Sequence, residues 1–116
     1  MFTQAREERM AKNKRHELFE RLHEILGKYP TCLETKPEDF RFIMLKLAPN
    51  KAEGFLFEGR NLRDDKIYRF LVYKEAESIK FVLSIDGEIT KQSSFYPTAT
   101  EMTSLFEETI DHILMF

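Results

Sequence analysis

The chain has 116 residues and a formal net charge of −2, with 42% hydrophobic and 33% charged residues. This length and balance are typical of one folded domain and exclude a disordered chain. The single cysteine, Cys32, excludes an internal disulfide, and the small net charge predicts no general polyanion-binding surface. We therefore expect residues 1–116 to form a single α+β domain.

The N-terminal segment and the hydropathy pattern predict a cytoplasmic protein without a membrane partner. The opening MFTQAREERM lacks the apolar stretch of a signal peptide. No run approaches the roughly 18 apolar residues of a membrane span. A lone thiol also fits a reducing compartment.

The first predicted element is an amphipathic helix over residues 15–27. Its apolar side chains recur three and four positions apart on one face: Leu18, Leu22, Ile25 and Leu26. Gly27 is typical of a helix C-cap. Fewer apolar residues lie upstream, so we expect residues 1–14 to be a mobile or an extended helical arm.

Residues 36–48 have two interpretations. A Thr-x-x-Glu capping box precedes an apolar pattern with helical spacing, which predicts a second helix. The alternation of Phe40, Phe42 and Met44 instead fits a strand. We favour the helix because of the capping box, and the strand remains the alternative.

From residue 54 onward the pattern predicts an antiparallel meander of four strands. The segments GFLFEG (54–59) and KIYRFLVYKE (66–75) are the first two strands. The segment 78–95 is a hairpin, since its Asp86-Gly87 dipeptide is typical of a tight turn. Its last strand is polar, as expected at a sheet edge.

The last predicted element is a helix that begins with a second capping box, Thr98 and Glu101. Its apolar stripe is Met102, Leu105, Phe106, Ile110, Ile113 and Leu114. The predicted fold is therefore α+β, with two N-terminal helices, a four-stranded antiparallel meander, and a C-terminal helix packed on one sheet face.

The strand at 66–75 predicts a partner-binding surface, because apolar side chains occupy both of its faces. A strand in a two-layer domain should be polar on one side, and an exposed apolar patch marks an interface. We expect Tyr68, Phe70, Val72 and Tyr73 to contact another protein or a second copy of the chain. The alternative is that the N-terminal helix covers this surface.

The basic run REERMAKNKR predicts an alternative function, nucleic-acid binding. Its cations are Arg6, Arg9, Lys12, Lys14 and Arg15. Phosphate binding needs several cations on one helix face, but opposite charges four residues apart, as in Glu17 with Arg21, are typical of a solvated helix. We favour the solvated helix, or one that faces the acidic last helix.

No motif predicts catalysis, a cofactor or a metal site. His16, His23 and His112 lie among charged residues, which is typical of surface histidines, and only one Glu-x-x-His pair occurs. Phosphate-loop, dinucleotide and nucleophile-elbow motifs do not occur. We expect a non-enzymatic protein-binding module of the regulator, inhibitor, immunity-factor or chaperone type, acting through the apolar sheet face or the N-terminal helix. Nucleic-acid binding is the alternative, and a small enzyme of unknown chemistry is the third.

Overall fold

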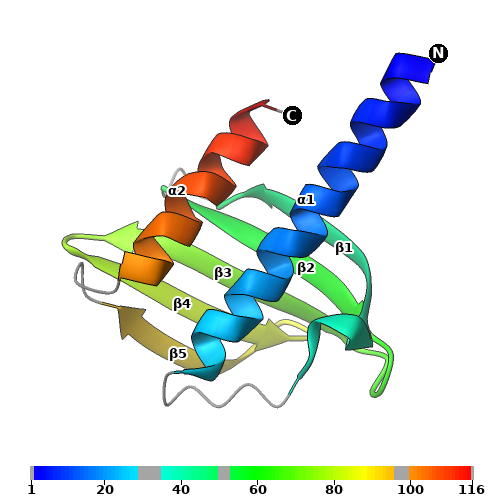
Figure 1. The fold of residues 1–116 in the computed structure, drawn as a ribbon. Coiled ribbons are helices and arrows are strands. Elements are labelled where there is room, and N and C mark those ends of the chain that lie inside the picture. The colour runs from blue at the N-terminus through cyan, green and yellow to red at the C-terminus, as the bar shows by residue number, and fades with distance from the viewer. Residues whose placement is uncertain (1, 29–34, 50–52, 96–99, 116) are drawn as a thin grey trace.

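The computed structural model describes residues 2–28, 35–49, 53–95 and 100–115, with side chains from residue 13 onward. This part of the chain forms one five-stranded antiparallel sheet and two helices. The elements in chain order are α1 (Phe2–Gly27), the 3₁₀ turn η1 (Pro37–Asp39), β1 (Phe40–Leu47), β2 (Gly54–Asn61), β3 (Ile67–Glu75), β4 (Ser78–Ile85), β5 (Glu88–Phe95) and α2 (Thr100–Met115). The strands pair in sequence order, and both helices lie across one face of the sheet (Figure 1).

The predicted α+β class, the antiparallel meander and the helices near both ends are confirmed, but the second N-terminal helix is wrong. Residues 36–48 instead form η1 and an additional strand, β1, so the sheet has five strands. Lys36 occupies the N-cap position of η1 without a side-chain cap bond, and Thr35 lies 3.3 Å from the His23 ring. The buried side chains of β1 pack against α1 and β2, and this packing outweighs the local helix preference that the capping box indicated.

A β-bulge explains why β1 resembles a helix in sequence. The register of β1 on β2 shifts between Arg41 and Met44, so that an extra residue is inserted there. As a result the two buried side chains of this segment, Phe40 and Ile43, are three residues apart, as on a helix face. Gly59 on β2 lies against the bulge, where an added Cβ would contact Phe40 and Ile43.

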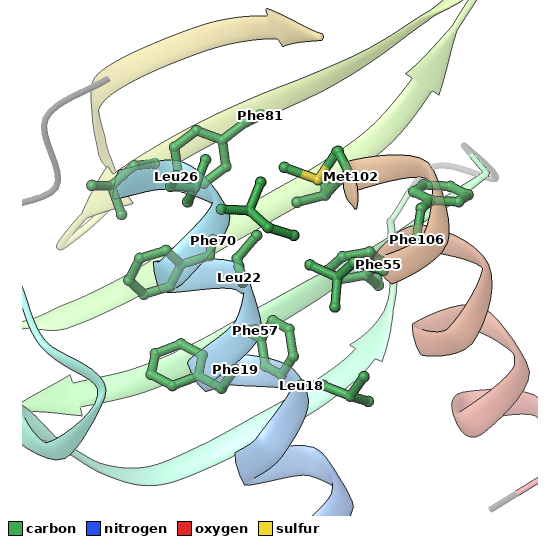
Figure 2. Packing of buried hydrophobic residues seen from close by; sticks show 14 of the residues in the cluster. Leu18, Phe19, Leu22, Leu26, Phe55, Phe57, Phe70, Phe81, Met102 and Phe106 are labelled. Atoms are coloured by element: carbon green, nitrogen blue, oxygen red, sulfur yellow. The ribbon is translucent and has the colours of Figure 1, made fainter. Parts of the chain in front are cut away.

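The core is a layer of phenylalanines between the sheet and α1. Phe19 on α1 packs against Phe40, Phe57 and Phe70, with ring centroids 5.2–5.3 Å apart. Figure 2 shows α1 and α2 bringing their apolar side chains onto the same sheet face. The fully or almost fully buried members include Leu18, Phe19, Leu22, Leu26, Phe55, Phe57, Phe70, Phe81, Met102, Leu105 and Phe106. The apolar face predicted for residues 15–27 is thus confirmed.

Two ion pairs join α1 to α2. Arg21 binds Glu108, and the Lys28 Nζ lies 3.2 Å from a Glu101 carboxylate oxygen. The pairing of Arg21 with Glu17 that the sequence spacing predicted is replaced by this contact between helices. Because all four side chains are partly exposed, each pair contributes little to stability.

The predicted hairpin and its edge strand are confirmed. Asp86 and Gly87 have φ values of 50° and 88°, as a two-residue turn with both central residues at positive φ requires. Asp86 also ties this turn to β3, since its side chain accepts a hydrogen bond from the Ile67 amide at 2.9 Å. The predicted cap residue Thr98 and the thiol of Cys32 lie outside the described residues. No helix in the described ranges is long and apolar enough to cross a membrane.

Candidate functional site

The structure places most of the predicted partner-binding residues in the core. Tyr68 is 7% exposed and Phe70 and Val72 are fully buried, all on the sheet face that the helices cover. Tyr73 lies on the opposite face and is partly exposed. Of the four residues, only Tyr73 is therefore at the described surface. The other three lie under the helices, as in the alternative in which the N-terminal helix covers this face.

The open face of the sheet carries a short apolar row with polar neighbours. Leu56, Leu71 and Val82 are directly opposite one another on β2, β3 and β4. Beside them the Arg69 Nε donates to Glu58 at 2.8 Å. This face is thus only partly apolar, and a hollow of about 590 Å³ lies over it.

A larger candidate site is the groove between α1 and β1, with a volume of about 720 Å³. Because the strand order puts β1 at one end of the sheet, one row of its backbone N–H and C=O groups has no neighbouring strand among the described residues. The groove is lined by Asn13, Arg15, His16, Phe40, Arg41, Phe42, Ile43 and Met44. We call this site the α1–β1 groove.

Phe42 gives the groove an exposed aromatic side chain on an unusual backbone. Its φ is 54°, a left-handed conformation that costs a non-glycine residue about 1–2 kcal/mol. Its side chain is 81% exposed, so packing within the described chain does not compensate for that cost. The neighbouring Met44 is also exposed, at 51%. The apolar surface of the groove is therefore available to a ligand.

The charges of the groove lining are cationic. Neither Arg15 nor Arg41 has a carboxylate partner among the described residues, whereas the His16 Nε2 lies 3.2 Å from Glu20. Arg41 is directly opposite Arg60 in the β1–β2 ladder, and Arg60 is itself paired with Asp65 at 2.8 Å. Among the residues whose side chains are described, no Asp or Glu lines the groove.

The residues predicted for nucleic-acid binding are only partly brought to this site. Arg15 lines the groove, while Lys14 lies 3.7 Å from Glu17. Arg6, Arg9 and Lys12 belong to α1, and their side chains lie outside the described ones. Among the described side chains, Arg15 is therefore the one cation of the basic run that lines the groove.

The prediction that His23 is a surface residue is wrong. Its side chain is buried, and its ring contacts Phe19, Phe40 and Phe70. Its Nδ1 donates to the Phe19 carbonyl oxygen at 3.1 Å, which leaves Nε2 to accept from the Thr35 hydroxyl at 3.3 Å. Burial lowers the pKa of His23 below its ordinary value, although the bond to the Phe19 carbonyl opposes this shift.

Neither a metal centre nor a relationship to known proteins marks a site on this chain. In the part of the chain that the structure describes, no group of three or more His, Cys, Asp or Glu side chains could hold a metal ion. Comparison with protein families, with curated proteins and with solved structures found no match. The candidate site consequently rests on geometry and chemistry alone.

The α1–β1 groove was not among the sites predicted from the sequence. It requires β1 to be a strand, whereas the capping signal favoured a helix there. The alternation of Phe40, Phe42 and Met44 was the signal that could have indicated an edge strand. It could not have shown that Phe42 is exposed, because that depends on the bulge.

Proposed function

We propose that the chain is a protein-binding module that adds an extended segment of its partner to β1 in the α1–β1 groove. The observation that carries this proposal is an edge strand beside a helix, with the apolar Phe42 exposed between them. In β-strand addition, backbone hydrogen bonds along the free edge supply affinity and side-chain pockets supply specificity. The groove provides both kinds of contact.

The other sheet edge fits this role less well. The exposed side chains of β5 include the polar Thr90, Gln92 and Ser94, which discourage association through an edge. The hollow that reaches β5 next to β4 is smaller, about 250 Å³, and mostly polar residues line it. We therefore place the bound segment on β1.

The backbone at Phe42 supports the same choice. Left-handed φ values in bulky residues persist where the surrounding structure enforces them, and such residues cluster at functional sites. A glycine would adopt this φ of 54° without steric cost. An exposed phenylalanine at this position gives the isolated chain no packing advantage, but it offers a partner a large apolar contact.

The first experiment identifies and locates a bound peptide. Random peptides of about ten residues, the length of a long strand, are displayed and selected on the immobilised protein. The binders are then titrated into the protein while backbone amide NMR shifts are followed. We expect the largest changes at residues 40–47 of β1 and at residues 13–16 of α1.

The matched variants are Phe42→Gly and Ile89→Ser. Loss of the Phe42 contact should weaken peptide binding by about tenfold or more while the fold is retained, since burying such a side chain contributes about 1.5–3 kcal/mol. Ile89 is 62% exposed on β5 and does not line the groove, so Ile89→Ser should bind as the parent does. Shift changes centred on Leu71 and Val82, or no selected peptide, would contradict the proposal.

A further inference from the structure

We infer that the segment bound in the α1–β1 groove is acidic, an inference that rests on the proposed strand addition. Arg15 from α1 and Arg41 from β1 both line the groove, and its described lining contains no carboxylate. The ligand class that complements this lining is an extended peptide that carries Asp or Glu beside apolar residues.

The two arginines of the groove differ from the other arginines whose side chains are described. Each of the others lies within 4 Å of a carboxylate: Arg21 with Glu108, Arg60 with Asp65, Arg63 with Asp39, and Arg69 with Glu58. Arg15 and Arg41 have no such partner in the described chain, and they share one groove. The protein thus offers two guanidinium groups at the place where its strand edge is free.

Arg41 carries a further electrostatic cost that an acidic partner would relieve. It is directly opposite Arg60 in the antiparallel ladder, and like charges at such positions are destabilising. Asp65 forms an ion pair with Arg60, which leaves the charge of Arg41 uncompensated among the described residues. A carboxylate on an added strand next to β1 would reach the Arg41 guanidinium, whose planar donors match a carboxylate in two parallel hydrogen bonds.

The observations favour a peptide over a nucleic acid. Backbone N–H and C=O groups of a free strand edge pair with another strand, and a nucleic acid has no equivalent row of groups. Glu17 and Glu20 on α1 are more than half exposed near the start of the groove, where they would repel a run of phosphates. A peptide can place its carboxylates at the two arginines alone.

The test uses three blocked peptides of about ten residues in which Val alternates with Glu, with Gln or with Lys, so that length and apolar content are matched. Fluorescence anisotropy should show the Glu peptide binding about five- to tenfold more tightly than the Gln peptide, with the Lys peptide weakest. The difference between Glu and Gln should shrink in about 0.5 M salt, because the charges are partly exposed.

A charge swap tests the two arginines directly. The double variant Arg15→Glu with Arg41→Glu should prefer the Lys peptide, and Arg15→Gln with Arg41→Gln should bind the Glu and Gln peptides equally. Lys80→Glu on β4, outside the groove, makes the same net charge change as the double Arg→Gln variant and should keep the preference of the parent. Circular dichroism checks that each variant is folded.

The outcomes separate the inference from the proposed function. Equal binding of the Glu and Gln peptides by the parent overturns the acidic partner and leaves strand addition standing. Failure of all three peptides, together with failure of the display selection, overturns strand addition itself. Binding of a single-stranded DNA probe in place of peptides, with loss in the arginine variants, assigns the groove to nucleic acid and overturns both.

Discussion

Gly54 on β2 lies tightly against the backbone of β3. A Cβ built on it would overlap the Val72 carbonyl oxygen and lie 2.6 Å from the Tyr73 Cα, which are backbone atoms that cannot move aside independently. We expect Gly54→Ala to lower the free energy of unfolding by about 2–3 kcal/mol, as overpacking does in a rigid site. Urea denaturation followed by circular dichroism measures this change.

Gly27 provides the matched control. It ends α1, has no atom within 4 Å of an added Cβ, and does not have a positive φ. Gly27→Ala should therefore leave stability unchanged or raise it by about 0.4–1 kcal/mol through the unfolded chain. Equal losses for the two variants would show that the close approach at Gly54 is not the cause.

At the scale of elements, the contact between α1 and α2 depends on apolar packing with a small electrostatic contribution. Burial of Leu18, Leu22 and Leu105 is complete, whereas Arg21 and Glu108 are 31% and 46% exposed. The hydrogen bond from Arg21 is the main cause that lowers the pKa of Glu108, so this contribution is present at neutral pH and is lost as Glu108 becomes protonated in acid.

A double-mutant cycle on Arg21→Ala and Glu108→Ala should give a coupling energy of about 0.5 kcal/mol at low salt, and less in about 1 M salt. The same cycle on Arg21 and Glu17 is the control. Its coupling should be smaller, because Arg21 is directed to α2 and Glu17 is near Lys14. A larger coupling to Glu17 would show that the intrahelical pair predicted from the sequence dominates in solution.

The elements that sequence reasoning predicted are those whose buried positions follow a regular period. Leu18, Leu22 and Ile25 repeat as a helix requires, and Ile79, Phe81 and Leu83 alternate as a strand requires. β1 was not predicted because its bulge breaks the alternation. The spacing of apolar residues therefore predicts an element only where no bulge inserts an extra residue.

The candidate site could not be predicted for a related reason. On β3 both faces are apolar, and the sequence cannot tell which of them the helices will cover. In the structure α1 and α2 cover the face of Phe70 and leave that of Leu71 open. The groove itself joins Arg15 to Arg41 across two elements, a proximity that only the packing of α1 on the sheet creates.

At the scale of the whole molecule, His23 makes stability depend on pH. Its pKa is lowered in the folded state by burial, so the unfolded chain binds a proton more readily. The contribution of His23 to the free energy of unfolding is therefore fully present above the ordinary histidine pKa of 6.5. It declines as the pH falls below that value. One such group changes the free energy of unfolding by at most about 1.4 kcal/mol per pH unit.

We expect urea midpoints to fall between about pH 7 and pH 5, and a His23→Leu variant to show a shallower decline. Burial also lowers the pKa of His112, with Lys14 and Arg15 adding to the shift, so part of the decline should persist in that variant. His16→Gln, at an exposed histidine, controls for the replacement of an imidazole. An unchanged slope in His23→Leu would show that His23 is not buried in its neutral form.

The placement of the meander between two helices has a consequence for the order of events during synthesis. As the nascent chain leaves the ribosome, α1 emerges before the sheet, yet the phenylalanines that cover its apolar side belong to strands made later. Each strand can pair at once with the one before it, since neighbours in sequence are neighbours in the sheet. Until α2 follows, however, Phe55 lacks its contact with Phe106. Before α2 is made, α1 is therefore the one described helix that covers the apolar face of the sheet. The part of this face that α2 later covers stays exposed, and such surface makes a folding intermediate prone to aggregation.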